Sequence, residues 1–333
     1  MNISVVIPNW NGIEIIGDAI KSLQNQTIGV DIIVVENAST DGSYEYLKDN
    51  FPDIKILRNK KNLGFDGGVN TGIRYSLKKG YKYIALLNSD AVVDKKWAEM
   101  LVKHLEPNPN TGIVASKIVT RDGKYIDSVG DYYTIWGLAY PTGRGEKDTG
   151  QYEKSKYVFG GSGGASMYRA KLFKDIGIFD EDFFAYYEDI DISFRAQLAG
   201  WKVWYEHSAV TYHATNSTSK KMASGFMTYQ TLKNMPWVLW KNVPLRFLPQ
   251  TIPRFMVAYL GFIISAIQKR YYIETLKGTT VSLIKFPKKI LQRSTIQRSR
   301  AVSSKYIKSI LVYDLPPNAE KLRRLRHALR IRF

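Results

Sequence analysis

Residues 179–201 read FDEDFFAYYEDIDISFRAQLAGW, a stretch in which acidic and aromatic residues lead into a helical pattern. Ile190, Phe194 and Leu198 recur every four residues, which predicts one buried face of a short helix. Gly200 follows as the expected residue just beyond the helix C-terminus, a position that glycine favours. The stretch therefore predicts an acidic, aromatic loop followed by a packed helix.

Two acids of this stretch, Glu188 and Asp189, fall in the first turn of the predicted helix, where the helix dipole favours negative charge. Acidic first turns are common, so a purely structural role is open. The residues just before them read FFAYY, which predicts an aromatic and partly apolar wall beside the carboxylates. Such surroundings raise the pKa of a carboxylate toward that of a general base, so a catalytic role is open as well.

The composition bounds the class of protein. A chain of 333 residues suits one or two domains with a sizeable core. The absence of cysteine excludes disulfides, thiolate zinc sites and a cysteine nucleophile, and it fits a reducing compartment. We expect no secretory signal, because Met1–Pro8 leads directly into an apolar strand pattern.

The formal charge of +18 is distributed unevenly. Residues 1–213 hold about 25 basic and 27 acidic residues, whereas residues 214–333 hold about 23 basic and 3 acidic ones. Such asymmetry favours a polyanionic partner for the C-terminal part. We therefore predict two regions, residues 1–225 and a basic, mainly helical region of residues 226–333.

Apolar, β-branched runs predict buried strands at residues 3–7, 32–35, 54–57 and 83–87, with helices between them. We expect a glycine-rich turn at residues 62–72 that leads into a helix at 69–79. Residues 91–178 predict a helix and then mixed strands and loops, and Trp201–Tyr205 predicts a further strand that leads to Ala209–His213. Strands that alternate with helices at this spacing predict an α/β fold with a mainly parallel central sheet.

Polar side chains follow the predicted strands where each one ends. In α/β sheets of this kind, ligands bind beyond the carboxyl ends of the strands. The sequence therefore predicts a binding site that gathers these residues at one edge of the sheet. They are Asn9 and Asn11, Glu36 and Asn37, and Asn88 and Asp90.

Two glycine-rich segments do not fit known phosphate-binding motifs. FGGSGGASMYR, at residues 159–169, lacks a following Gly-Lys-Ser/Thr, which excludes an NTPase P-loop. GFDGGVNTG, at residues 64–72, does not match the dinucleotide-binding fingerprint, which is GxGxxG directly after a strand together with an acidic residue further along the chain. This argues against a dinucleotide site.

The C-terminal region mixes aromatic and basic residues. Phe255–Ile267 is an apolar run of about 13 residues, short of the ~20 that a membrane-spanning helix needs. It predicts either a buried core helix or a helix in the membrane interface. Tyr306–Arg332 ends in a basic amphipathic pattern whose apolar positions are Leu322, Leu325, Leu329 and Phe333.

Six sequence blocks, in order, carry a resemblance to a known family. They read VVIPNWNG (5–12), IIVVENASTDGS (32–43), NLGFDGGVNTGI (62–73), LLNSDAVV (86–93), the 179–201 stretch and YHATNST (212–218). The chain resembles the inverting family-2 glycosyltransferases, especially the rhamnosyltransferase-like branch, over about 215 residues. The resemblance implies a Rossmann-like GT-A fold, a nucleotide-sugar donor, a divalent metal (Mg²⁺ or Mn²⁺) and inversion at the anomeric carbon.

The resemblance also implies metal ligands. NSD stands where the family has a DxD-type motif, so Asp90 supplies the carboxylate alone. His213 is then the second protein ligand, and such a pair with substrate oxygens suits Mg²⁺ or Mn²⁺. Without the resemblance, a satisfied core histidine is the favoured interpretation of His213.

The remaining roles follow from the same resemblance. Asp189 is the expected general base that deprotonates the acceptor hydroxyl, and Glu188 orients the acceptor or the helix terminus. The donor site comprises Pro8, Asn9, Trp10, Glu36, Asn37, Gly67, Gly68, Asn70, Asn88, Ser89 and Asp90. The acceptor site comprises Tyr187, Asp191, Gly161 and Trp136. Structural roles are open for some of these residues: turn chemistry for Glu36 and Asn37, an i,i+4 pair with Arg195 for Asp191, and core packing for the aromatics.

Three functions are consistent with these features. The first is a metal-dependent inverting glycosyltransferase with a dTDP-L-rhamnose donor, where UDP-galactofuranose, a UDP-hexose or GDP-mannose stay open, and a lipid-linked or cell-surface glycan acceptor. It would act as a peripheral protein on the cytoplasmic face of the membrane, held to anionic lipid by the basic region, and an oligomer is possible. The second is a sugar nucleotidyltransferase. The third is a nucleic-acid binder, which the neutral N-terminal region disfavours, so we expect no nucleic-acid partner.

Overall fold

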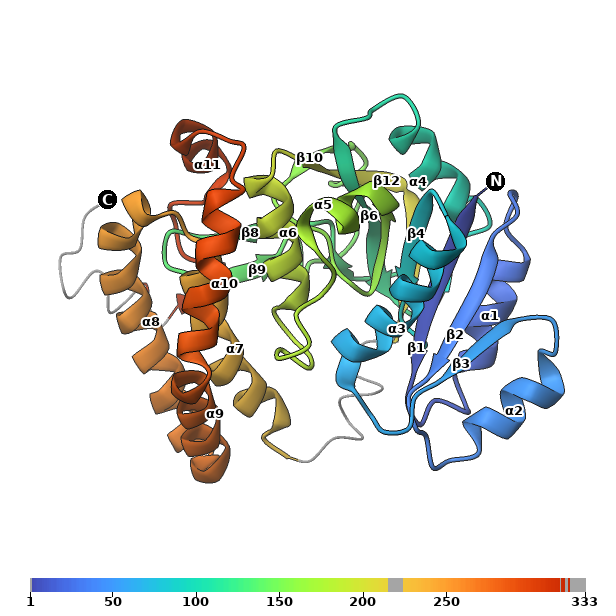
Figure 1. Ribbon diagram of the computed structural model, residues 1–333, viewed down its shortest axis with the longest axis horizontal. Coiled ribbons are helices and arrows are strands. Elements are labelled where there is room, and N and C mark those ends of the chain that lie inside the picture. Colours follow the sequence, from blue (N-terminus) through green and yellow to red (C-terminus); the bar gives the residue numbers. More distant parts are fainter. Residues whose placement is uncertain (1, 215–223, 318, 321–322, 324–333) are drawn as a thin grey trace.

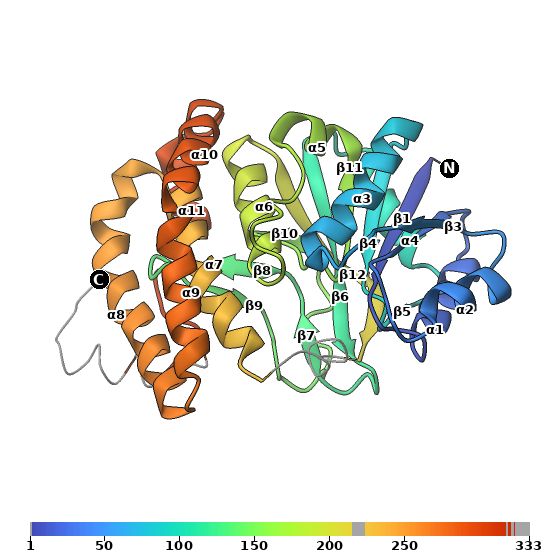
Figure 2. The ribbon, with the colours of Figure 1, turned by 60° about the horizontal axis from the view of Figure 1, so that its bottom comes forward.

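The computed structural model describes residues 2–214, 224–317, 319–320 and 323. A twisted sheet with helices on both faces forms one side of the molecule, and a layer of long helices, α7 to α10, forms the other (Figures 1 and 2). The acidic stretch and helix α6 lie between the two parts.

The N-terminal half of the sheet is parallel, as the alternation of elements predicts. Strands β3 (Lys55–Arg58), β2 (Asp31–Glu36), β1 (Ile3–Asn9) and β4 (Tyr83–Leu87) pair in that order. The apolar residues of β1, β2 and β4 are buried because helices cover both faces, whereas those of the edge strand β3 are partly buried. The connecting helices are α1 (Ile16–Gln24), α2 (Ser43–Asn50) and α3 (Gly64–Lys79).

The rest of the sheet is mixed. Strand β11 (Ala165–Arg169) runs antiparallel to β4 and to β6 (Thr111–Thr120), and β6 pairs in parallel with β12 (Lys202–His213). The strand predicted at Trp201–Tyr205 is thus longer than expected and continues to His213, with a bulge between Glu206 and Val210. The predicted α/β fold with a mainly parallel central sheet is confirmed. The smaller elements are β5 (Ala91–Val93), β7 (Ile126–Ser128) and β10 (Lys156–Val158) in the same sheet, the hairpin β8 (Asp131–Tyr133) and β9 (Ala139–Pro141), and helices α4 (Trp97–Leu105) and α5 (Ala170–Ile176).

The glycine-rich segment is not the turn that we predicted. Helix α3 begins at Gly64, so most of residues 62–72 are helical. Glycine suits these positions because the helix packs closely on strand β1. A Cβ atom added at Gly72 would lie 2.3 Å from the Val6 side chain, and one at Gly68 would lie 3.2 Å from Pro8.

Helix α6 (Glu188–Leu198) confirms the predicted helix and its C-terminal glycine. Gly200 has a φ of 90°, and the Trp201 amide donates to the carbonyl of Ala196. Ile190, Phe194 and Leu198 pack into the core that α6 shares with the C-terminal helices. The opposite face of α6 packs on the sheet, so every residue of the helix except Asp189 is buried.

The C-terminal region is helical, as predicted, and consists of five helices and a 3₁₀ turn in the described residues. Helix α8 spans 21 residues, so the expectation of an apolar helix too short to cross a membrane is wrong. The segment Leu245–Gln268 is long and apolar enough to span a bilayer, and most of it is not buried within the protein. The elements are α7 (Phe226–Asn242), the 3₁₀ turn Leu245–Phe247, α8 (Leu248–Gln268), α9 (Tyr272–Ile284), α10 (Phe286–Arg298) and α11 (Ser304–Ile310).

The segment from Tyr306 onward begins inside the core rather than as an exposed tail. Ile307, Leu311 and Leu315 are buried in the C-terminal core, and the Tyr306 hydroxyl donates to Gln197 on α6. The amphipathic pattern from Leu322 to Phe333 lies, apart from Arg323, outside the described residues.

Candidate active site

A cleft of about 690 Å³ opens at the carboxyl ends of the parallel strands. Its wall on the sheet side comes from the residues that follow β1, β2 and β4, and its other wall comes from the acidic stretch and the start of α7. Of the predicted site residues, it gathers Pro8, Asn9, Trp10, Asn37, Asn88, Ser89, Asp90, Tyr187, Glu188, Asp189 and His213.

Asp90 and His213 meet at this cleft, as predicted for a metal pair. Strand β5, just after Asp90, pairs with the end of β12, and this places the His213 Nε2 atom 3.0 Å from Asp90 Oδ1. Asp127 lies 2.9 Å from His213 Nδ1 and fixes the orientation of the ring. Burial alone would lower the pKa of His213, but the hydrogen bonds with Asp127 and Asp90 outweigh it and raise the pKa to about 9.

The arrangement matches what a divalent ion needs from a protein. A carboxylate and an imidazole converge, and the second nitrogen of the imidazole faces another carboxylate, the usual outer-shell arrangement of a metal-binding histidine. No group of three or more His, Asp or Glu side chains suitable for a metal occurs in the described ranges. An ion here would therefore take its other ligands from substrate oxygens and water, as Mg²⁺ commonly does.

The predicted donor residues divide into those that face the cleft and those that do not. Asn9 lines the cleft, and its buried carboxamide has no hydrogen-bond partner within the described chain. Asn37 also lines it, although its own amide is occupied, donating to Gly64 and accepting from Leu63. Glu36 is fully buried and accepts from the Ser39 amide, so its turn-forming role is the one that the structure supports.

Asp189, the predicted base, lies at the start of α6 and faces the cleft. Its Oδ1 atom accepts from the Ile190 amide at 2.8 Å. Burial raises the pKa of Asp189 despite this bond and one with the Gly163 backbone.

Glu188 is more deeply buried than Asp189. Burial, followed by repulsion from Asp189, raises the pKa of Glu188 well above its usual value. Its Oε2 atom has no partner among the described residues, and neither carboxylate oxygen of the nearby, fully buried Asp66 has one. Burial and the charge of Glu188 likewise raise the pKa of Asp66. Burial thus favours the neutral form of both acids, which fits the supporting role predicted for Glu188.

The sequence interpretation missed three charged residues of the cleft, which are Asp127, Asp131 and Arg144. Asp131, at the start of β8, has its pKa raised to about 7 by burial and by the charge of Asp189. Arg144, in the turn after β9, lines the cleft and lies 2.9 Å from Asp127 Oδ1. The segment DSVGD, residues 127–131, was the available signal, because two acids flank a glycine there as in many turn-borne sites.

Several predicted acceptor residues do not reach the cleft. Trp136 is fully buried in the C-terminal core, and Gly161 packs against Ala115 and Ser166. Asp191 has no exposed surface and pairs with Arg195 at 2.9 Å, as the i,i+4 alternative predicts. Neither these side chains nor the Gly161 backbone lines the surface that an acceptor would contact.

The helical positions of the donor set are structural too. Gly67 and Gly68 lie inside α3, where they allow contact with Leu63 and Pro8, and neither lines the cleft. Asn70 is buried, and its side chain exchanges hydrogen bonds with the backbone of Phe179. It therefore fastens the start of the acidic stretch to α3 instead of binding a ligand.

Comparison with known proteins identifies the family. The model of the family "Glycosyl transferase family 2" matches residues 4–177, just over half of the chain. The chain belongs to glycosyl transferase family 2. It is therefore a glycosyltransferase that takes a nucleotide-sugar donor, which excludes the nucleotidyltransferase alternative.

Curated relatives of this glycosyltransferase have diverse names. It is 26% identical over 241 residues to the low-salt glycan biosynthesis hexosyltransferase Agl10 of Haloferax volcanii, covering 70% of this chain and 74% of that protein. It is 27% identical over 215 residues to the N-acetylglucosaminyl-diphospho-decaprenol L-rhamnosyltransferase of Mycobacterium tuberculosis, covering 59% and 70%.

Solved structures establish the fold of the glycosyltransferase. The structure of GalNAc-T7 with UDP, GalNAc and Mn²⁺ matches with a TM-score of 0.58 at 16% identity, covering 72% of this chain and 48% of that one. S. aureus TarS matches with a TM-score of 0.54 at 16% identity, covering 99% and 53%. The expected GT-A fold is confirmed.

Proposed function

We propose that this glycosyltransferase is a metal-dependent, inverting enzyme that moves a sugar from dTDP-L-rhamnose to a hydroxyl of a lipid-linked or cell-surface glycan. One observation carries the proposal: Asp90 with His213 and the carboxylate of Asp189 lie in the same cleft. Inversion needs a leaving diphosphate on one side of the anomeric carbon and a base on the other, and in this proposal the metal pair and Asp189 would take those two roles.

The metal side of the cleft would bind the donor diphosphate. Mg²⁺ or Mn²⁺ held by Asp90 and His213 would neutralise the phosphate charge and act as a Lewis acid on the leaving group. The Mn²⁺ and UDP in the GalNAc-T7 structure support this choice of cofactor. The unpaired carboxamide of Asn9 supplies a donor and an acceptor for the nucleotide.

The base side of the cleft would bind the acceptor. Asp189 would take the proton of the acceptor hydroxyl, and its raised pKa makes it a stronger base than an ordinary carboxylate. Phe184 and Tyr186 of the acidic stretch and Phe226 of α7 form an aromatic cluster in the wall beside it. Such a wall suits stacking on sugar rings.

The donor sugar is proposed from a relative. The name of the M. tuberculosis protein includes both L-rhamnose and a decaprenol-linked acceptor, at 27% identity. UDP-galactofuranose, a UDP-hexose and GDP-mannose are the alternatives that the experiment compares.

A thermal-shift screen with Mn²⁺ tests the donor. A true ligand at 100 times its Kd adds about 2.7 kcal/mol to the free energy of unfolding, so the cognate nucleotide sugar should raise the melting temperature clearly. Product analysis of the transferred sugar then gives the anomeric configuration. The proposal would be overturned if the product kept the anomeric configuration of the donor, or if no nucleotide sugar raised the melting temperature.

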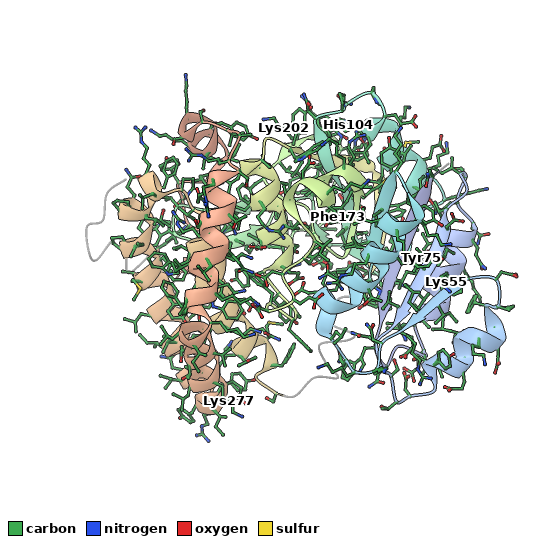
Figure 3. All side chains as sticks on the ribbon, in the orientation of Figure 1. Lys55, Tyr75, His104, Phe173, Lys202 and Lys277 are labelled. Atoms are coloured by element: carbon green, nitrogen blue, oxygen red, sulfur yellow. The ribbon has the colours of Figure 1, made fainter. Side chains whose placement is uncertain are left out.

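We also propose that the enzyme docks on the cytoplasmic face of the membrane as a peripheral protein. Helices α8 and α9 expose large apolar side chains to solvent, among them Met256, Leu260, Ile273, Leu276 and Leu283. Exposed cations lie between them at Lys269, Arg270 and Lys277, and Lys277 projects from the part of the helical layer far from the sheet (Figure 3). This combination suits the interface of an anionic bilayer.

Vesicle flotation tests the membrane proposal. Leu276→Glu with Leu283→Glu should reduce binding of the full chain to phosphatidylglycerol vesicles at low salt, because both side chains are exposed on α9. Tyr157→Glu, which alters an exposed aromatic residue on β10, is the control and should bind as the wild type does. Equal flotation of all three proteins would refute docking through this surface.

A further inference from the structure

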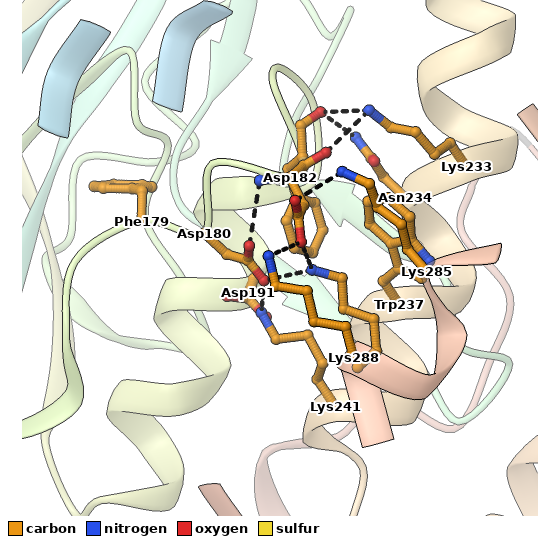
Figure 4. Close-up of polar contacts among 12 residues, drawn as sticks. Phe179, Asp180, Asp182, Asp191, Lys233, Asn234, Trp237, Lys241, Lys285 and Lys288 are labelled. Atoms are coloured by element: carbon orange, nitrogen blue, oxygen red, sulfur yellow. Dashed lines mark hydrogen bonds and ion pairs between the residues drawn. The ribbon is translucent and has the colours of Figure 1, made fainter. Parts of the chain in front are cut away.

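The acidic stretch is held by residues of the C-terminal helices. The Lys241 ammonium lies 2.7 Å from Asp180 Oδ2 (Figure 4). The Lys289 ammonium lies 2.8 Å from Asp180 Oδ2 and 2.7 Å from Asp182 Oδ2. Lys289 is fully buried. Burial alone would raise the pKa of Asp180, but the charges of Lys241 and Lys289 hold this pKa well below its usual range. Some of the lysines in the basic region therefore pair with acids of the same chain rather than with an external polyanion.

Two adjacent residues of α7 bind the backbone of the same stretch. The Asn234 side-chain amide donates to the carbonyl oxygens of Phe183, Ala185 and Tyr186 at 3.0, 2.9 and 2.8 Å. The Lys233 ammonium lies 3.1 Å from the carbonyl oxygens of Asp182 and Phe183. One asparagine therefore satisfies three carbonyls of a loop that forms no regular structure.

This loop has an unfavourable backbone conformation. Phe184, Tyr186 and Tyr187 have φ angles of 67°, 67° and 73°, in the left-handed region that residues with a side chain seldom occupy. Such conformations cost of order 1 kcal/mol or more each and persist only where surrounding contacts impose them. The contacts from Asn234 and Lys233 reach the residues on both sides of Phe184.

We propose that Asn234 and Lys233 are positioning residues that hold the 183–187 loop in its left-handed conformation and thereby aim Asp189 into the cleft. The proposal rests on the proposed function, since it assigns the role of base to Asp189. Because Asp189 lies in the first turn of α6, two residues after this loop, a shift of the loop moves the carboxylate and the aromatic wall together. The Asn234 amide donates to the loop and not to the donor side, which is built on β1, β4 and β12.

Asn234→Leu tests the proposal, because leucine keeps the size of the side chain and removes the three donated bonds. We measure dTDP release from dTDP-L-rhamnose with Mn²⁺ as hydrolysis, in which water takes the place of the acceptor hydroxyl and receives the rhamnosyl group, and dTDP affinity by calorimetry. The variant should lower kcat by about 10- to 100-fold, the range that a small misplacement of reacting groups produces, while KM for the donor and the Kd for dTDP stay within about twofold. Lys233→Met, which removes two contacts instead of three, should lower kcat by a smaller factor.

Asn242→Leu is the matched control. Asn242 lies on the same helix, is equally buried and donates to Asp191 instead of the loop. Its kcat should stay close to that of the wild type. An equal fall of kcat in both variants, or a loss of dTDP affinity in step with kcat, would overturn the positioning role.

Hydrogen exchange gives a readout that does not depend on the proposed reaction. Amides of residues 183–189 should exchange faster in Asn234→Leu than in Asn242→Leu, with α7 equally protected in both. Unchanged exchange in this loop would overturn the proposal even if the enzyme were active. If the wild type released no dTDP but the loop exchanged faster as expected, the proposed donor would fail and the loop contact would stand.

Discussion

Replacing Lys241 with methionine tests how much the buried charge network between α6, α7 and the acidic stretch stabilises the fold. The Lys241 ammonium is 2% exposed and lies 2.7 Å from Asp180 Oδ2 and 2.9 Å from Asp191 Oδ1. Removing one partner of a buried ion pair costs about 3–5 kcal/mol, because it leaves an uncompensated buried charge. Asp191 keeps Arg195 and Asp180 keeps Lys289, so we expect a value near 3 kcal/mol.

Urea denaturation at pH 7 measures this loss. With an m-value of about 3 kcal/mol per molar, the midpoint should fall by about 1 M. Lys171→Met is the control, because Lys171 is 66% exposed and pairs with Asp175 on the surface of α5, an interaction worth about 0.5 kcal/mol at most. A midpoint of Lys241→Met within about 0.2 M of that of Lys171→Met would refute the reasoning.

The pH dependence of the same variant provides a second check. The surrounding lysines hold the pKa values of Asp180 and Asp191 below normal against the effect of burial. A carboxylate with a lowered pKa stabilises the fold above its unfolded pKa of about 4, and this stabilisation is lost as the pH falls through the folded value. The difference between wild type and Lys241→Met should thus be complete at pH 7 and shrink below about pH 4.

Three further predictions concern the site and the sheet. Asp90→Asn should abolish sugar transfer and remove the Mn²⁺ dependence of nucleotide affinity in calorimetry, whereas affinity that still responds to Mn²⁺ would exclude Asp90 as a ligand. Asp189→Asn should lower the pKa of Asp131, followed by carboxyl NMR titration, because the charge of Asp189 adds to burial in raising that pKa to about 7; an unmoved pKa would show that burial alone raises it. Gly72→Ala should lower the free energy of unfolding by about 1–3 kcal/mol through overpacking against Val6, whereas Gly29→Ala, with open space around it, should change it by less than about 0.5 kcal/mol; equal denaturation midpoints would contradict this.

The sequence predicted the sheet and the edge where ligands bind because both depend on local patterns. Buried strands have β-branched, apolar runs, and the polar residues after them must lie at one edge of a parallel sheet. Asp90 and His213 are paired in the sequence only through the family resemblance, since 122 intervening residues separate them and no local pattern links them.

Further features required the three-dimensional structure. The glycines of α3 look like turn residues in sequence, and only the proximity of Val6 and Pro8 explains why a helix contains them. Asp191 lies beside Asp189 in sequence, which favours an acceptor role, yet a helix turns by about 100° per residue, so its side chain points into the core. Lys241 and Lys289 belong to the basic region by composition, and a count of charges cannot show which of them meet acids from another segment.

The lysine and asparagine contacts on the acidic stretch have a consequence for exchanging parts between related enzymes. The family model ends at residue 177, before the acidic stretch begins. The residues that contact the stretch lie more than forty residues later, on α7 and α10. A chimaera that took its C-terminal helices from a relative, to change the acceptor or the membrane, would inherit foreign partners for Asp180, Asp182 and three loop carbonyls. Residues 180–191 and helices α7 and α10 therefore form a single unit of exchange, and grafts should move them together.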